Sequence, residues 1–354
     1  MNTLDDRPAQ AGALAVRPYQ DSDRQAWDAF VFACPQATFF HRIGWREIFE
    51  TVFKHRTHYL IARRGEQIVG VLPLVRVKSL LFGDALASLP FAVYGGVAVI
   101  DAAATGALHQ AAIALGRELG VQHLELRNRE TLEPNWPHQD LYVTFRKNLL
   151  PEVEANMLAI PRKQRAVVRK GIQRNLRSEI DVDTGRFFDL YADNQHRHGT
   201  PPHSRRYFEA LRRVFGDDCE VLTAVTPEGK AVASVMSFYF RDEVLPYYAG
   251  DVVEARALSA NDFKYWELMR RACERGIKVF DYGRSKLETG SYDFKRNWGF
   301  EPAVLHYEYQ LFSRESVPQN NPANPKYRAA IDIWRRLPRG VVNAIGPVLA
   351  RHLG

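Results

Sequence analysis

Cysteine is scarce in this sequence. The 354 residues include only Cys34, Cys219 and Cys273. Because they are odd in number and far apart, they exclude a disulfide framework and a metal site built from thiolates. This usage is typical of a reducing compartment, and we expect these cysteines to be inert.

Long apolar runs and export signals are also missing. The most apolar segments, such as Phe91–Ile100, fall short of the roughly 20 residues that cross a bilayer. Residues 1–16 carry Asp5, Asp6 and Arg7 and lack the basic start and apolar stretch of a secretion signal. We therefore expect a cytoplasmic protein without a transmembrane segment.

Side chains at metal-ligand spacing are not found either. His196, His198 and His203 lie close together, but the segment also contains Arg197 and Pro201 and reads as a loop. A metal site is therefore not expected. What the sequence does contain is average for a globular protein, with 46% apolar and 25% charged residues. Its length predicts two domains, and its net charge of +7, with clustered basic residues, favours anionic partners.

An internal repeat organises the chain. Each half reads as a helix, a two-stranded hairpin, an aromatic strand ending in glycine, a long helix and a short strand. In the first half these elements are Trp45–Phe53, Tyr59–Arg63 with Ile68–Val77, Phe91–Gly96, Ala104–Leu119 and Gln122–Arg127. In the second half they are Tyr207–Phe215, Val221–Val225 with Ala231–Phe240, Leu245–Gly250, Asn261–Arg275 and Lys278–Gly283.

The two long helices end at matched glycines, Gly120 and Gly276, which are suited to left-handed caps. This match favours duplication over two unrelated α/β domains. The element order resembles the acyl-CoA N-acyltransferase (GNAT) fold, in which the site lies where the central strands diverge. The expected fold is α/β (α+β), with tandem GNAT-like units, each a mixed, largely antiparallel sheet flanked by helices. The expected ranges are 1–150 and 181–312, joined by a basic segment at 151–180 and followed by a tail at 313–354.

The connecting segment between the repeats is unusually basic. Residues 161–177 contain seven basic residues and no acidic residue. If this segment is helical, Val168, Ile172 and Leu176 form an apolar stripe, and the basic side chains are left to bind phosphate oxygens. The candidate phosphate ligands are Arg162, Lys163, Arg165, Arg169 and Lys170. The alternatives are a solvated helix face without a ligand, or binding to a diphosphate, CoA or tRNA.

Two late motifs carry a family resemblance. Residues 280–286 read Phe-Asp-Tyr-Gly-Arg-Ser-Lys, and residues 294–300 read Phe-Lys-Arg-Asn-Trp-Gly-Phe. This pair resembles the late motif of the FemA/FemB/FemX superfamily, whose members transfer amino acids from aminoacyl-tRNA and build peptidoglycan bridges. A closer resemblance, nearly end to end, is to a Fem-related subgroup associated with PEP-CTERM exosortase and exopolysaccharide gene neighbourhoods. The motifs that carry it are residues 161–165, 198–201, 261–266 and 324–328.

The resemblance implies catalytic roles for particular residues. Lys295 corresponds to the lysine of the Fem Phe-Lys motif, near the acyl-transfer centre, where an ammonium would stabilise a developing oxyanion; the alternative is a surface lysine that caps a helix. Asp281 is a candidate general base or, alternatively, the partner of an arginine such as Arg284. Tyr248 and Tyr282 are candidate proton donors to a leaving group or residues of the core. The further candidate substrate-binding residues are Arg284, Lys286, Arg296, Asn261 and Trp298.

The sequence differs from GNAT and Fem enzymes in two features that concern the acyl donor. The loop at 250–259 lacks the glycine-rich pattern that cradles the CoA diphosphate in GNAT enzymes and contains two added acids. The long helical arm found in many tRNA-gripping Fem enzymes is missing too. The resemblance implies an activated acyl donor as co-substrate, and the two departures leave both aminoacyl-tRNA and acyl-CoA open. No tightly bound cofactor is expected.

The C-terminal tail contains a basic, amphipathic pattern. After a linker-like run at 313–322, residues 327–353 place apolar residues at helical spacing among arginines, and Pro338 and Pro347 divide them into short helices. This pattern fits peripheral docking on an anionic membrane surface through residues 326–354, or packing on the body of the protein. The leading hypothesis is an acyl or aminoacyl transferase that acts, in a groove between the units, on an amino group of an anionic or lipid-linked envelope or exopolysaccharide precursor. The alternatives are an acetyl-CoA-dependent N-acetyltransferase and a non-catalytic protein that binds nucleic acid or polysaccharide.

Overall fold

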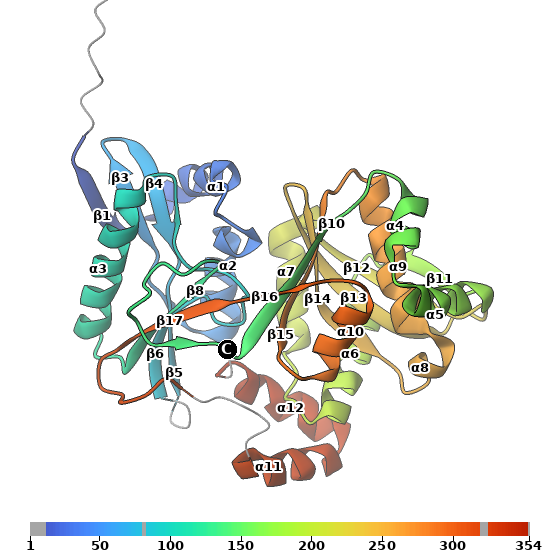
Figure 1. Ribbon diagram of the computed structural model, residues 1–354. Helices are drawn as coiled ribbons and strands as arrows, with labels where there is room; N and C mark the ends of the chain where they lie inside the picture. Colours follow the sequence, from blue (N-terminus) through green and yellow to red (C-terminus); the bar gives the residue numbers. More distant parts are fainter. Residues whose placement is uncertain (1–11, 80–82, 319–324, 353–354) are drawn as a thin grey trace, which may run out of the picture. The chain divides into compact units, whose positions relative to one another are not determined.

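The structure, a computed structural model, describes residues 12–79, 83–318 and 325–352 (Figure 1). Residues 1–11 of the N-terminal segment, 319–322 of the predicted linker and Asn324 of the tail motif lie outside the described residues. The chain forms two compact units. Unit 1 comprises residues 1–50, 54–138 and 307–317, and unit 2 comprises residues 51–53, 139–306 and 318–354.

Unit 1 is built from two sheets. The four-stranded sheet has the order β1 (Leu14–Pro18), β3 (Leu60–Arg64), β4 (Gln67–Leu72) and β7 (Ala98–Val99). The six-stranded sheet has the order β2 (Arg56–Thr57), β5 (Val75–Ser79), β6 (Gly83–Ser88), β8 (His123–Asn128), β17 (His306–Leu311) and β9 (His138–Gln139). Its helices are α1 (Arg24–Ala33), α2 (Gly44–Ile48) and α3 (Ala102–Glu118), with short helical segments at Asp21–Asp23 and Phe39–His41. A further helical segment, Phe49–Phe53, begins in unit 1 and ends in unit 2. The long helix α3 buries Ala104, Leu108 and Ala112, spaced by four residues, in the apolar core of this unit.

Unit 2 contains one seven-stranded sheet. Its strand order is β11 (Arg177–Ile180), β12 (Cys219–Val225), β13 (Ala231–Phe240), β14 (Glu243–Asp251), β15 (Val279–Lys286), β10 (Tyr142–Asn148) and β16 (Pro302–Val304). Its helices are α4 (Val153–Ala159), α5 (Arg162–Gln173), α6 (Gly185–His198), α7 (Arg205–Phe215), α8 (Ala255–Leu258), α9 (Ala260–Glu274), α10 (Gly290–Asn297), α11 (Pro325–Arg336) and α12 (Arg339–Ala350), with a short helical segment at Gly216–Asp218.

Helices cover both faces of the unit 2 sheet. Strand side chains alternate between the faces, so Val235 and Tyr239 of β13 pack in the core cluster that includes α9. Phe238 of the same strand contacts Phe215 of α7 on the opposite face. Helix α6 approaches β14 so closely that a Cβ on Gly250 would lie 2.3 Å from the Tyr191 amide nitrogen. A side chain at residue 250 would therefore push α6 away from the sheet.

The predicted α/β class is confirmed, because sheets flanked by helices form both units. The matched glycines end α3 and α9 in the same way. Gly120 and Gly276 have positive φ values of 65° and 73°. The next amides, of Val121 and Ile277, donate to carbonyls five residues earlier. Both helices therefore end in the same left-handed cap.

Three predicted elements were wrong. Phe91–Gly96 is not a strand: Phe91 has a φ of 65°, and the amides of Gly95 and Gly96 both donate to the Arg127 carbonyl. The predicted strand Ile68–Val77 is divided into β4 and β5, which belong to different sheets, because Pro73 lacks the amide hydrogen that a continuous ladder needs. The predicted loop around His196 and His198 is instead the last turn of α6.

The sequence-based unit ranges differ from the structural units in two strands. Strand β10, at Tyr142–Asn148, pairs with β15 and β16 in the sheet of unit 2. Strand β17, at His306–Leu311, stands beside β8 in the six-stranded sheet. Each half of the chain thus contributes one strand to the sheet formed mainly by the other half.

The tail packs on unit 2. Gly199, at the end of α6, lies against Ile331 of α11, and His196 hydrogen-bonds to the Trp334 carbonyl at 3.2 Å. Helix α12 contacts the same region, because a Cβ on Gly346 would lie 2.6 Å from Pro202. Within the described residues, none of the helices has both the length and the apolar composition that a bilayer crossing requires.

Candidate active site

Strands β14 and β15 diverge in the middle of the unit 2 sheet. They run parallel and pair only at Glu243 with Val279 and at Val244 with Phe280. Beyond this point β14 continues along β13 as far as Asp251, and β15 continues along β10. The inner backbone edges of the two strands therefore have no ladder between them over the second half of each strand. Such edges can hydrogen-bond an extended ligand.

A bulge in β14 marks the start of the divergence. Met236 pairs with Tyr248 and the next residue, Ser237, pairs with Pro246, so that Tyr247 is an additional residue on β14. Bulges of this kind redirect side chains and increase the local twist of a strand. The bulge lies within the predicted aromatic strand Leu245–Gly250.

A second bulge lies across the divergence, on β15. The pairs of Arg146 with Asp281 and of Thr144 with Arg284 leave two residues of β15 opposite one residue of β10. Gly283 has a φ of 62°, a conformation that L side chains rarely adopt. The carbonyl groups at this bulge turn away from the regular ladder and need other donors.

Lys295 of α10 supplies those donors. Its Nζ donates to the carbonyls of Tyr282 at 2.8 Å, Gly283 at 3.0 Å and Arg284 at 3.0 Å. The side chain is buried, and this burial lowers the pKa of Lys295 to about 7, while nearby Asp281 acts in the opposite direction. An ammonium has three N–H bonds, and in this geometry all three are directed to carbonyls at the bulge of β15.

Asp281 is fully buried at the point where β14 and β15 begin to diverge. It accepts hydrogen bonds from the Arg146 guanidinium at 2.6 Å and from the Gly283 amide at 2.7 Å. Arg146 also forms an ion pair with Glu243 of β14. One arginine of β10 thus joins the carboxylates of both diverging strands, and no local sequence pattern indicates this long-range partner.

The two tyrosines proposed as proton donors occupy different environments. The hydroxyl of Tyr248 is hydrogen-bonded to that of Tyr207 at 2.8 Å, inside a cluster of aromatic rings from α6 and α7. The hydroxyl of Tyr282 is buried and has no hydrogen-bond partner among the described residues. Burial raises the pKa of both phenols well above the usual value, so both stay protonated at neutral pH.

Asn261 belongs to a partly buried polar network at the end of β14. Its amide donates to Asp251 at 2.6 Å, and its oxygen accepts from Lys264 at 2.9 Å. Asp251 also accepts from Arg197 and Asn194 of α6 at 2.5 Å and 2.7 Å. Burial lowers the pKa of Lys264 to about 8. Lys264, Asp251 and Arg197 were not among the predicted site residues, although Lys264 follows Asn261 in the 261–266 motif.

Trp298 joins three helices in the core. It is fully buried, and its indole Nε1 donates to Asp262 of α9 at 3.1 Å. Gln164 of α5 donates to the same carboxylate oxygen. Burial raises the pKa of Asp262. The structure therefore places Trp298 where it fixes α5 against α9 and α10.

The basic segment forms helix α5, but its buried face differs from the predicted stripe. Val168 is fully buried, whereas Ile172 is 42% exposed and Leu176 lies beyond the helix end at Gln173. Gly171 faces α9 instead, because a Cβ there would lie 2.8 Å from Phe263. The helix therefore packs through Val168 and Gly171 and turns Ile172 outward.

The cations of α5 point mostly to solvent. Arg165 donates to the Leu158 carbonyl at 2.7 Å. Four side chains are exposed and form no ion pair within the described part of the chain: Arg162, Lys163, Arg169 and Lys170. Their charges remain available for an anionic ligand.

The remaining predicted binding residues lie over aromatic rings. The Arg284 guanidinium is 4.5 Å and the Lys286 ammonium 5.7 Å from the centre of the Tyr142 ring. Arg296 lies 5.8 Å from the ring centre of Tyr292. Burial lowers the pKa of Lys286, with a further contribution from Arg284. Arg284 and Lys286 are on the diverging part of β15, and Arg296 is on α10.

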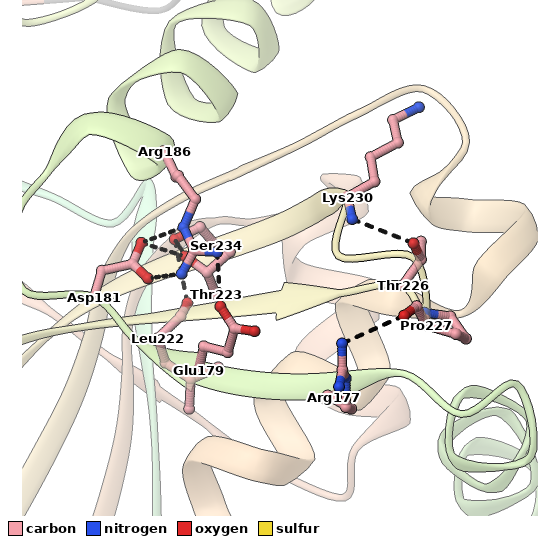
Figure 2. Close-up of polar contacts among 10 residues, drawn as sticks. All are labelled: Arg177, Glu179, Asp181, Arg186, Leu222, Thr223, Thr226, Pro227, Lys230 and Ser234. Atoms are coloured by element: carbon pink, nitrogen blue, oxygen red, sulfur yellow. Dashed lines mark hydrogen bonds and ion pairs between the residues drawn. The ribbon is translucent and has the colours of Figure 1, made fainter.

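A further polar network fixes the start of α6. Figure 2 shows Arg186 between the carboxylates of Asp181 and Glu179. Asp181 also accepts from Thr223 at 2.9 Å, and the Thr223 and Ser234 hydroxyls are 2.8 Å apart. Because this network links α6 to β12 and β13, it helps to hold the helix that carries Arg197. Within the described residues no group of histidine, cysteine and carboxylate side chains is arranged to hold a metal ion.

Comparison with known families places this geometry in a known fold. Residues 162–296, from the start of α5 to α10, match the family described as acetyltransferase (GNAT) domain. This stretch has the fold of a GNAT domain. The diverging strands β14 and β15 lie entirely within it. A comparison with curated proteins gives no significant match.

Solved structures resemble the chain over most of its length. FemX is 14% identical, with a TM-score of 0.66, and the match covers 84% of this chain and 98% of FemX. The C-terminal domain of a putative lysylphosphatidylglycerol synthetase from Agrobacterium fabrum is 12% identical, with a TM-score of 0.57 and coverages of 82% and 93%. A tandem GNAT protein from the clavulanic acid biosynthesis pathway is 14% identical, with a TM-score of 0.54 and coverages of 86% and 100%. At these identities the likeness shows the fold.

Proposed function

We propose that the protein is an acyltransferase that moves an acyl or aminoacyl group from an activated donor to an amino group. The observation that carries the proposal is the divergence of β14 and β15 inside a GNAT domain, with a bulge on each strand. The acyl arm of the donor would lie along the unpaired backbone edges of the two strands. There, fixed amide dipoles can orient the reacting carbonyl and stabilise the charge that develops on its oxygen.

The reaction is a substitution at an acyl carbon. The amine nitrogen forms a bond to this carbon while the ester C–O or thioester C–S bond breaks. The nitrogen loses a proton, and the leaving oxygen or sulfur gains one. Tyr282 is the better candidate for the second proton transfer, because it belongs to the diverging part of β15 and its protonated hydroxyl has no partner among the described residues, although its ring packs against Tyr265 and Trp298. Asp281 remains a candidate base, but its carboxylate already binds Arg146.

The donor that we favour is aminoacyl-tRNA. The four exposed cations of α5 suit a polyanion. At the end of β14, in contrast, the side chain of Asp251 is a carboxylate that already accepts hydrogen bonds from Asn194, Arg197 and Asn261. The segment that holds the CoA diphosphate in GNAT enzymes here contains the short helix α8, in which the amides of Ala255 and Leu258 already donate to protein carbonyls. Acyl-CoA is the second candidate, favoured by the match to an acetyltransferase domain.

For the acceptor, we propose an amino group of a cell-envelope or exopolysaccharide precursor. The Fem-like motifs at 280–286 and 294–300 support this substrate class. The fold similarity to FemX is consistent with it. The PEP-CTERM and exopolysaccharide setting rests on the sequence resemblance alone.

The decisive experiment measures donor consumption. The protein is incubated with aminoacyl-tRNA or acetyl-CoA and a pool of amine acceptors, and mass spectrometry follows both the spent donor and the acylated product. We expect amine-dependent turnover with one donor. Consumption of neither donor over the background rate would rule out the transferase proposal.

The role of Tyr282 is tested with Tyr282→Phe. Since its hydroxyl makes no hydrogen bond to a described residue, removing it should leave the free energy of unfolding within about 0.5 kcal/mol of wild type. Turnover should fall by about 10²-fold, the lower end of the range for a lost proton-transfer group. Tyr239→Phe, which removes a hydroxyl bonded to Glu220, is the control and should keep full turnover. Full turnover of the Tyr282→Phe variant would remove this residue from the mechanism.

A further inference from the structure

Helix α12 has two apolar faces. Val342, Gly346 and Ala350 are buried and follow one another at intervals of four residues. Val341, Ile345 and Val348 lie on the other side of the helix and are 42%, 42% and 55% exposed. From residue 340 to residue 350 the sequence contains no charged side chain. One side of α12 is therefore held by the protein, and an apolar row remains uncovered by the described residues.

The buried side is fixed by specific contacts with unit 2. Gly346 lies against Pro202, and Arg339, at the start of α12, forms an ion pair with Asp193 of α6. Because Arg339 and the buried row face α6, the helix cannot turn its exposed row inward without breaking this ion pair. The exposed row is thus a fixed feature of the folded tail.

Basic residues flank the exposed row along the chain. Residues 325–354 contain six Lys or Arg residues and the single acidic residue Asp332. Arg335 and Arg336 precede α12, and Arg351 follows it. Ile333 of α11 adds another exposed apolar side chain, with 62% of its surface accessible. An apolar row flanked by arginines at both ends of a helix matches the boundary between acyl chains and anionic headgroups.

We propose that this surface, formed by Val341, Ile345 and Val348 with the flanking arginines, docks the protein on an anionic lipid surface. The apolar row would enter the headgroup boundary, and the arginines would pair with lipid phosphates. A second copy of the chain fits less well, because two tails with the same excess of positive charge repel one another face to face. This inference does not depend on the proposed acyl transfer, since it uses no residue of the candidate active site.

The test is vesicle flotation of the full chain. Wild type is mixed with vesicles of phosphatidylglycerol and phosphatidylcholine in equal parts, or of phosphatidylcholine alone, at low and high salt. We expect binding to the anionic vesicles that weakens with salt, and little binding to the neutral ones. The variant V341S/I345S/V348S should bind anionic vesicles at least about tenfold more weakly.

A matched control removes three exposed valines elsewhere in unit 2. V182S/V253S/V304S changes residues that are 91%, 70% and 50% exposed and should bind vesicles like wild type. Thermal unfolding should be alike for all three proteins, because every substituted side chain is exposed. The proposal is overturned if wild type does not float with anionic vesicles or if both triple variants lose binding equally. It is also overturned if light scattering shows that wild type and V182S/V253S/V304S are dimers and V341S/I345S/V348S is a monomer. In that case a second copy of the chain would cover the apolar row.

Discussion

At the residue scale, the hydrogen bonds of Lys295 predict a role in stability. A lysine that donates three hydrogen bonds to the bulge of β15 stabilises the folded strand first, and acts on catalysis through the position of that strand. We predict that Lys295→Met lowers the free energy of unfolding by about 3 kcal/mol, because buried carbonyls lose their donors. Urea unfolding measures this change. Lys295→Arg should not restore stability, since a planar guanidinium cannot reach three carbonyls on one bulge.

The control for Lys295 is its neighbour. Arg296 is exposed, so Arg296→Met should change the free energy of unfolding by less than about 0.5 kcal/mol. A direct role as oxyanion stabiliser predicts a different pattern. In that case Lys295→Met would unfold like wild type and lose turnover, and our positioning role would be refuted.

His203 gives the molecule a predictable response to acid. It packs against the rings of Tyr207 and Tyr248, and its burial lowers the pKa to about 4 from 6.5. Between these two values the unfolded chain binds a proton at His203 and the folded chain does not, so stability is full above pH 6.5 and is lost as the pH falls toward 4. The full loss from this residue is on the order of 3 kcal/mol.

This acid response is measured as a difference between two proteins. The free energy of unfolding of wild type and of His203→Gln is followed from neutral pH down to about pH 4. Carboxylates contribute to both curves alike, so the variant should show the shallower decline. Parallel curves would mean that His203 is protonated in the folded protein as readily as in the unfolded chain.

Sequence reasoning at this scale found residues but not their partners. The late motif pointed to Lys295, Asp281 and Tyr282, which do lie together on β15 and α10. It could not reveal Arg146, which is 135 residues from Asp281 and reaches it only because β10 joins the sheet of unit 2. The sequence also did not reveal which candidates are buried. Trp298 was predicted to bind substrate, but it is fully buried and makes the contacts of a core residue.

At the element scale, the exposed cations of helix α5 allow a test of whether the protein binds tRNA. We predict that the double variant Arg169→Gln/Lys170→Gln folds normally and binds tRNA more weakly, because both side chains are exposed. The slope of log affinity against log salt should become shallower by about 0.7–0.9 for each phosphate that the variant no longer neutralises. Filter binding at several salt concentrations measures both effects.

A control of equal charge distinguishes this site from general attraction. Lys230 and Lys278 have side chains that are 62% and 76% exposed on other parts of unit 2. Lys230→Gln/Lys278→Gln removes the same charge and should leave the affinity and the salt slope near the wild-type values. If the two double variants weaken binding equally, α5 is not the binding element.

Element prediction succeeded where the hydrophobic period was long and regular. Helices α7 and α9 and strands β12 and β13 follow their sequence patterns closely, and so do the glycine caps. It failed at Phe91–Gly96, where an aromatic run resembles a strand but the positive φ of Phe91 breaks it. It also failed for the buried face of α5, because the contact to α9 is made by Gly171, a residue that apolar patterns ignore.

At the scale of the whole molecule, the exchange of strands between the two halves could not be read from local patterns. Local sequence patterns indicate pairing between neighbouring strands, as in the two predicted hairpins. Strand β10 instead lies between β15 and β16, more than a hundred residues later in the chain. The duplication was visible because it repeats local signals, whereas the exchange is a property of pairing alone.

The exchange of strands determines which fragment of the chain we expect to fold. A fragment of residues 151–354 follows the boundary suggested by the sequence but lacks β10, and so leaves the facing edges of β15 and β16 without a partner. A fragment of residues 139–354 differs by twelve residues and keeps the seven-stranded sheet, including the bond from Arg146 to the buried Asp281. Losing that arginine leaves an uncompensated buried carboxylate, which destabilises proteins by about 3–5 kcal/mol. We therefore expect cooperative thermal unfolding, followed by circular dichroism, for 139–354 only. Equal cooperativity of the two fragments would show that β10 is dispensable to unit 2, and a failure of both would show that unit 2 needs more of the first half than this one strand.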